Sequence, residues 1–196
     1  MSNQKFSIHL ADWLNSKEPK TLGQLQTKFG SKSFAVAFML LMILTALPLP
    51  TAGLTHALDI ITMLLALELI AGRQTIWLPK WANQKSLGKI MTKKALPKIL
   101  KWVTWFERLS RPRLSLLFLQ PWLLRFTGLL VLVFTLAAFF APLFTGLDTL
   151  PGLGVVLVAL GWLFEDSAIF TVGMVLGSLG ILLEASLGVA IFHLLR

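Results

Sequence analysis

Ionisable side chains inside apolar segments are the groups of this chain that could do chemistry. Asp59 lies five residues into an apolar run, and His56 precedes it by three residues, so the two share a helix face and could share a proton. Inserting a charged side chain at the centre of a bilayer costs about 2.5–3.5 kcal/mol, which makes such a residue a candidate functional group. The alternative is a wet helix start, where Asp59 would favour the positive end of the helix dipole.

Three further carboxylates interrupt apolar segments. Glu68 lies nine residues after Asp59 on the opposite helix face, where it could meet a basic residue of the next segment or face the bundle interior. Glu165 and Asp166 are adjacent, and Asp166 before Ser167 predicts a helix N-cap. Adjacent residues on one continuous helix point about 100° apart, so these two would be a poor acid–base pair unless the helix breaks there.

The last apolar segment carries small and acidic residues on one helix face. Its members are Asp166, Gly173, Gly177, Gly180, Glu184 and Gly188. Glycines at this spacing allow helices to approach closely, which predicts that Glu184 is buried and either protonated or paired with an arginine. The expected pairs are Arg73 with Asp166 and Arg125 with Glu184.

The composition excludes most classes of soluble protein. Of 196 residues, 56% are apolar and only 14% are charged, whereas soluble domains carry about 25% charged residues. The chain has no cysteine, which removes disulfides, thiolate catalysis and cysteine metal sites. Its three histidines are scattered, and it lacks nucleotide-binding, zinc-protease and serine-hydrolase motifs. We expect no metal, no cofactor and no catalytic residue; an intramembrane enzyme using Glu165 and Asp166 is the less favoured interpretation.

A basic segment separates two apolar regions. Residues 73–113 contain eleven lysines and arginines against Glu107 alone, and the same stretch holds four of the seven tryptophans. Tryptophan beside lysine is typical of a membrane–water interface, and the positive-inside rule places this connector in the cytoplasm against anionic lipid. Nucleic-acid binding is disfavoured because the basic residues flank apolar spans.

The apolar regions share one pattern, in which two apolar arms flank a Pro/Gly break. It occurs at 34–73 and again at 126–166, and an offset of 93 aligns Gly53 with Gly146 and Arg73 with Asp166. The residues that break the arms are Pro48, Pro50, Gly53, Pro142 and Gly146. Interrupted segments at corresponding positions of two halves indicate a transporter-like site. An internal repeat, with its orientation left open, would explain this pattern; the alternative is a chance match among apolar residues.

The predicted architecture is an all-α integral membrane protein, two interrupted helical hairpins joined by a basic amphipathic connector. Its parts are an amphipathic N-terminal region (1–32), the first apolar hairpin (33–72), the connector (73–113) and the second apolar bundle half (114–196).

Several short motifs in order resemble a known family. They are Thr21-Leu22-Gly23-Gln24-Leu25, Ala46-Leu47-Pro48-Leu49-Pro50-Thr51-Ala52-Gly53-Leu54, Gly72-Arg73 with Trp77-Leu78-Pro79, Glu107-Arg108-Leu109 with Arg111-Pro112-Arg113, and Glu165-Asp166. Together they resemble the ExoD family of bacterial exopolysaccharide-synthesis membrane proteins. The resemblance implies a multi-pass inner-membrane protein with a role in exopolysaccharide production, and implies no particular reaction.

The expected function follows from the resemblance and from the buried charges. We expect support of exopolysaccharide synthesis or export by transport of an ion or a lipid-linked intermediate. The carboxylates would accept protons or cations, and the arginines would be counter-ions or phosphate binders. The alternative is a non-catalytic membrane scaffold that binds the polysaccharide synthesis machinery.

Overall fold

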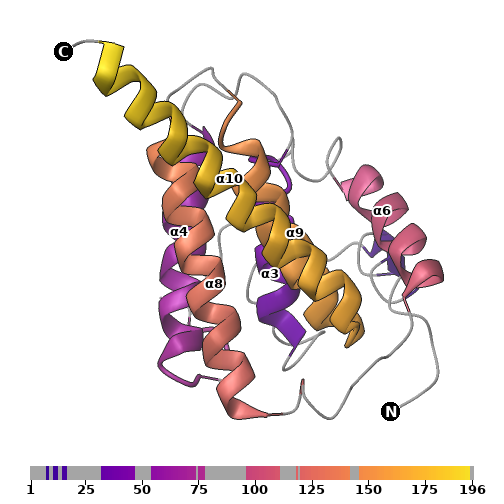
Figure 1. The fold of residues 1–196 in the computed structure, drawn as a ribbon. Helices are drawn as coiled ribbons and strands as arrows, with labels where there is room; N and C mark the ends of the chain where they lie inside the picture. The colour runs from indigo at the N-terminus through magenta and orange to yellow at the C-terminus, as the bar shows by residue number, and fades with distance from the viewer. Residues whose placement is uncertain are drawn as a thin grey trace.

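The fold is entirely helical over the residues that the structure describes. This computed structural model describes residues 8, 11–12, 15–16, 32–46, 54–73, 75–77, 96–110, 118, 120–141 and 146–194. They form six helices of ten residues or more and no strand (Figure 1): α3 (Ser33–Met42), α4 (Leu54–Ile70), α6 (Leu96–Leu109), α8 (Pro121–Phe140), α9 (Thr149–Phe164) and α10 (Ser167–Leu194). The all-α prediction is confirmed.

Some sequence predictions fall outside the described residues. They are most of the N-terminal region 1–32, much of the connector, and the break residues Pro48, Pro50, Gly53 and Pro142. The remaining break residue, Gly146, is exposed and has a φ of +70°, a backbone conformation that glycine adopts without steric cost.

Helix α3 is the core of the bundle. All ten of its residues are buried, including Ser33 at its first position. A helix that is apolar on every side is stable only when other helices surround it. Helix α3 packs against both α4 and α9, so the first hairpin and the second share one core.

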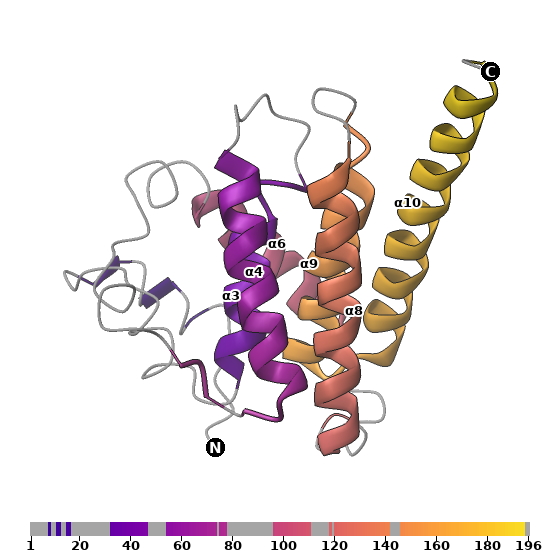
Figure 2. The same cartoon turned by 90° about the vertical axis from the view of Figure 1, so that its left-hand side faces the viewer.

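The two hairpins pack in a reciprocal way. Helix α3 contacts α4 and α9, and α8 contacts α9 and α4 (Figure 2). The first helix of each hairpin therefore contacts the second helix of its own hairpin and the second helix of the other. The end of α3 lies beside the start of α9, since a Cβ on Gly152 would be 3.1 Å from the backbone nitrogen of Ala46. Both hairpins are therefore interrupted at the same end of the bundle, which we call the break end.

The second helix of each hairpin ends in the same turn. Gly72 after α4 and Glu165 after α9 both have positive φ, +83° and +56°. The Arg73 and Gly72 amides donate to the carbonyls of Glu68 and Leu69, and the Asp166 and Glu165 amides donate to those of Gly161 and Trp162. This is the Schellman arrangement. The two left-handed residues lie 93 positions apart, the offset of the predicted repeat, which supports that prediction.

Helix α10 lies close to α9 because glycines line their contact. A Cβ on Gly154 would be 2.6 Å from the Gly177 Cα, and one on Gly173 would be 2.6 Å from the Val158 nitrogen. The predicted small-residue face therefore packs as expected at Gly173 and Gly177. Among the described residues, nothing lies within 4 Å of a Cβ added at Gly188, and α10 continues beyond the bundle at the break end (Figure 2).

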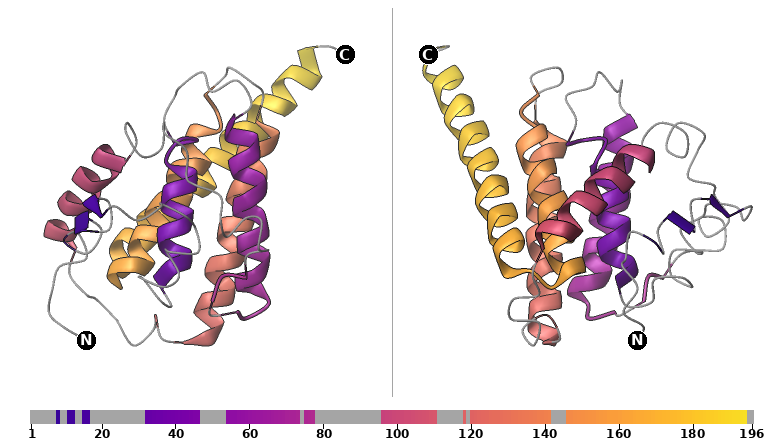
Figure 3. Two further views of the ribbon diagram at one scale, coloured as in Figure 1. Left: turned by 180° about the vertical axis from the view of Figure 1, so that it is seen from behind. Right: turned by 90° about the vertical axis from the view of Figure 1, so that its right-hand side faces the viewer.

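Two elements differ in extent or setting from the other apolar helices. Helix α8 begins at Pro121, because proline suits the first position of a helix, so Arg125 lies within α8 and does not precede it as expected. Helix α6 is amphipathic and lies beside α9 (Figure 3). It buries Val103 and exposes Trp105 and Leu109. By length and composition, Pro121–Phe140 and Ser167–Val189 are the described segments that could cross a membrane.

Candidate functional site: an acidic cluster at the break end

Four ionisable side chains converge where the hairpins are interrupted. Asp148, just before α9, is close enough to interact electrostatically with Asp59 and His56 of α4 and with Glu184 of α10. We call these four residues the acid–histidine cluster. Three separate elements supply its members, so only the packed bundle brings them together.

Asp59 is the most deeply buried member of the cluster. Its side chain is 1% exposed, and its Oδ1 accepts a hydrogen bond of 3.2 Å from the Thr45 hydroxyl. Thr45 follows α3, so this bond joins the two arms of the first hairpin at the break. One neutral donor offsets only part of the cost of burying an ionised carboxylate.

His56 lies at the edge of the cluster. Its Nδ1 is buried without a hydrogen-bond partner among the described residues, and its ring lies 5.1 Å from the Phe139 ring. The expected His56–Asp59 proton pair is not formed directly. Asp59 takes its hydrogen bond from Thr45, while His56 interacts electrostatically with Asp148.

Glu184 joins the cluster from α10. Its Oε1 is buried and, within the described part of the chain, has no hydrogen-bond partner. The expected pairing with Arg125 is wrong: Arg125 contacts Gly72 just beyond the end of α4, whereas Glu184 interacts with Asp148 at the break end, where α4 begins. The 17 residues of α4 span about 25 Å at 1.5 Å per residue. Glu184 faces an acid, Asp148, where the sequence analysis expected a base.

Asp148 was not recognised from the sequence. Its position two residues after Gly146 inside the second break is the signal that could have identified it, as a charged residue between apolar arms. Burial raises the pKa of Asp148, and the nearby His56 opposes this rise. The adjacent Thr149 hydroxyl is also buried without a partner among the described residues.

The cluster can accept protons or cations. Its three carboxylates have no lysine or arginine beside them in the described part of the molecule, and histidine is its one base. No group of three histidine, cysteine, aspartate or glutamate side chains in the described residues has the geometry of a metal site. Like charges close together favour proton sharing, which is the property expected of a proton relay.

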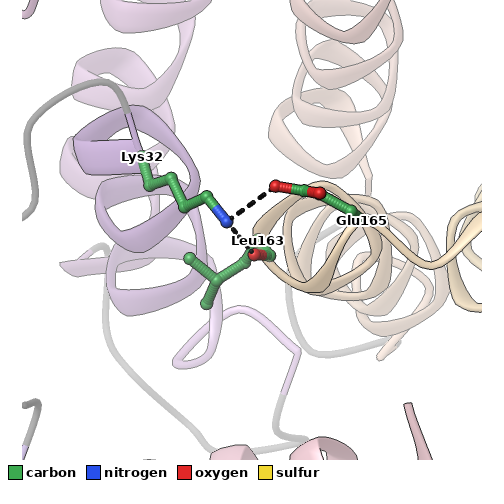
Figure 4. A network of polar contacts seen from close by, with 3 residues as sticks. All are labelled: Lys32, Leu163 and Glu165. Atoms are coloured by element: carbon green, nitrogen blue, oxygen red, sulfur yellow. Dashed lines mark hydrogen bonds and ion pairs between the residues drawn. The ribbon is translucent and has the colours of Figure 1, made fainter. Parts of the chain in front are cut away.

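The opposite end of the bundle holds the remaining predicted residues. Glu68 accepts a 2.7 Å hydrogen bond from the Trp77 amide, and the Arg73 guanidinium lies 5.8 Å from the centre of the Trp77 ring. Lys32 donates to Glu165 and to the Leu163 carbonyl, both at 3.0 Å (Figure 4). This contact ties α3 to the α9–α10 turn, and the sequence analysis missed it.

Glu165 and Asp166 have separate structural roles. Asp166 Oδ1 accepts hydrogen bonds from the Ala168 and Ile169 amides at 2.9 and 3.4 Å, which confirms the predicted N-cap of α10. Because the helix breaks between them, the two side chains point to different partners. The expected Arg73–Asp166 pair is therefore replaced by a cap.

Over the described residues, fold and site define an all-helical protein with two long apolar helices and a partly buried acidic cluster at the break end. Residues 7–186 match the family described as "Exopolysaccharide synthesis, ExoD". The chain belongs to the ExoD family, a family of exopolysaccharide synthesis.

Two curated proteins are similar to this chain. An uncharacterized Synechocystis protein, slr1875, is 24% identical over 79% of this chain and 72% of its own length. The protein ExoD of Rhizobium meliloti is 29% identical over 74% of this chain and 61% of its own length. The match thus spans about three fifths of the Rhizobium protein. No solved structure matches the fold.

Proposed function

We propose that this chain is a multi-pass inner-membrane protein whose connector faces the cytoplasm. Large apolar side chains lie exposed at helical spacing on the outer faces of three helices. They are Ile60, Leu64 and Leu67 on α4, Leu129, Val133, Leu136 and Phe140 on α8, and Val172, Val175, Leu179, Leu182, Leu183, Leu187 and Val189 on α10. In water such stripes would promote aggregation, whereas in a bilayer they contact lipid at no cost.

We propose further that the protein supports exopolysaccharide synthesis by moving an ion, in the simplest case a proton, through the acid–histidine cluster. The observation that carries this proposal is the convergence of Asp59, Asp148 and Glu184 at the end where both hairpins are interrupted. A protein keeps costly buried acids without a cationic partner where they bind and release charge.

Complementation in a strain lacking the gene tests this function. The strain would receive wild type, Asp59→Asn or Glu184→Gln, and secreted polysaccharide and growth at neutral and raised pH would be measured at matched protein level. We expect both variants to fail, because each removes an acid that must titrate. Asp166→Asn is the matched control: it removes the charge of a carboxylate at the opposite end of the bundle and keeps an acceptor oxygen for the α10 cap.

The scaffold alternative makes the opposite prediction. It is favoured by α6, whose exposed Trp105 and Leu109 could hold a component of the polysaccharide synthesis machinery. If this function is correct, neutralising Lys101 and Arg108 on α6 abolishes polysaccharide secretion, while Asp59→Asn leaves it unchanged. That combination of results would overturn the ion-transport proposal.

A further inference from the structure

Two arginines adjoin one turn at the end of the bundle opposite the acid–histidine cluster. Gly72 closes the turn after α4 with a φ of +83°, and a Cβ there would lie 3.4 Å from Arg125 Nη2. Because Gly72 has no side chain, the guanidinium of Arg125, from the first turns of α8, lies against it. Arg73 is the next residue in the chain and its guanidinium lies 5.8 Å from the centre of the Trp77 ring, so both arginines adjoin Gly72.

Neither arginine is neutralised within the described part of the chain. Glu68, the nearest acid in sequence, accepts its hydrogen bond from the Trp77 amide and forms no ion pair with Arg73 or Arg125 among the described residues. Both arginines are exposed. Two unpaired guanidinium groups at one turn favour an anionic ligand, and guanidinium binds phosphate oxygens in a bidentate manner.

Tryptophans indicate where this ligand lies. Trp77, below the Arg73 guanidinium, is 61% exposed, and Trp122 at the start of α8 is 57% exposed. Exposed tryptophan at the ends of apolar helices is typical of the level of lipid headgroups. A phosphate held beside these rings therefore belongs to a lipid more readily than to a soluble metabolite.

We infer that Arg73 and Arg125 form a binding site for the phosphate of an anionic phospholipid headgroup. Gly72 supplies the space for the Arg125 guanidinium, and Trp77 packs against Arg73. The inference rests on the proposed membrane location and is independent of ion movement through the cluster. The proposed lipid site lies at the end of the bundle opposite the acid–histidine cluster.

Lipid binding to the purified full-length protein tests the inference. Phosphatidylglycerol and phosphatidylcholine would be titrated into protein in detergent, and bound lipid counted by native mass spectrometry. We expect phosphatidylglycerol to bind preferentially, and Arg73→Gln with Arg125→Gln to weaken it about thirtyfold, the effect of removing two charges at an anionic surface. The double lysine variant keeps both charges and should retain intermediate affinity, because ammonium cannot bind in a bidentate manner.

The matched control is Lys101→Gln with Arg108→Gln on α6, which changes the net charge equally. The site is supported if this control changes affinity less than threefold. Equal loss in both pairs would overturn it in favour of diffuse attraction, and unchanged affinity in the Arg73/Arg125 variant would also overturn it. Displacement of the lipid by inorganic phosphate would overturn the lipid assignment. Failure of the wild type to enter lipid nanodiscs would instead count against the membrane location.

Discussion

Gly72 and Glu165 adopt the same backbone conformation with very different side chains. Glycine enters the left-handed region freely, whereas a residue with a Cβ pays about 1–2 kcal/mol there. Glu165 accepts this strain while binding Lys32, a partly exposed pair with side chains 41% and 30% exposed. Such a pair contributes about 0–1 kcal/mol, so the turn gains little net stability from glutamate.

A comparison of two substitutions at Glu165 isolates the strain. Both Glu165→Ala and Glu165→Gly lose the ion pair with Lys32, but only alanine keeps a Cβ in the left-handed conformation. We predict that Glu165→Gly unfolds with a free energy about 1 kcal/mol higher than Glu165→Ala, measured by denaturation in detergent. Gly72→Ala is the reciprocal control and should be destabilised. Equal stability of the two Glu165 variants would contradict the observed backbone conformation.

Asp166 should depend on an acceptor oxygen for the cap of α10. Its Oδ1 caps α10, so Asp166→Ala should lower the free energy of unfolding by about 1 kcal/mol. Asp166→Asn and Asp166→Ser should retain nearly all of the stability, since both supply an acceptor. A large loss in Asp166→Asn would show that the negative charge itself is required there.

At the scale of elements, the glycine contact between α9 and α10 fixes their separation. A Cβ on Gly154 would lie 2.6 Å from the Cα of Gly177, and backbone cannot move aside as a side chain can. We predict that Gly154→Ala lowers the free energy of unfolding by about 1–3 kcal/mol through overpacking. The measurement is thermal denaturation in detergent followed by circular dichroism.

Gly188→Ala is the control for that prediction. Nothing lies within 4 Å of a Cβ at Gly188, and alanine favours a helix over glycine by about 1 kcal/mol. The control should therefore be as stable as wild type or more so. If Gly154→Ala were equally stable, the close approach of α9 and α10 would be wrong.

The sequence predicted the helical elements well because apolar runs and breakers determine them. The second apolar bundle half expected at 114–196 contains α8, α9 and α10, and the cap at Asp166 was anticipated from its residue type. Pairings between elements were predicted poorly. Arg125 lies near the start of α8 and Glu184 in the second half of α10. Only the packing of these helices decides whether the two residues are close together. The Lys32–Glu165 contact joins residues 133 positions apart and leaves no local pattern.

At the scale of the whole molecule, the two ends of the bundle differ in their basic residues. The break end holds the acid–histidine cluster, whereas the other end holds Lys32, Arg73 and Arg125 together with three carboxylates. Three members of the cluster were recognisable from the sequence, but Asp148, which gathers them, was not. No spacing rule connects a residue before α9 with residues of α4 and α10, so this convergence follows from the fold alone.

This difference between the two ends predicts how the protein lies in the membrane. The chain has no cysteine, so single cysteines at Gln120 and His193, both exposed and at opposite ends of the bundle, can be labelled selectively. We predict that a membrane-impermeant maleimide reaches His193→Cys in intact cells, and reaches Gln120→Cys only after the membrane is opened. Labelling of both positions from one side would contradict the crossing proposed for α8 and α10.

Proton flux into liposomes tests whether the acid–histidine cluster moves protons. Purified wild type, Asp59→Asn and the control Asp166→Asn would be reconstituted at equal density, and an internal pH dye read after a membrane potential is imposed. We predict that wild type and Asp166→Asn acidify the lumen, whereas Asp59→Asn falls to the rate of empty liposomes. Flux through Asp59→Asn equal to wild type, or no flux through wild type, would contradict it.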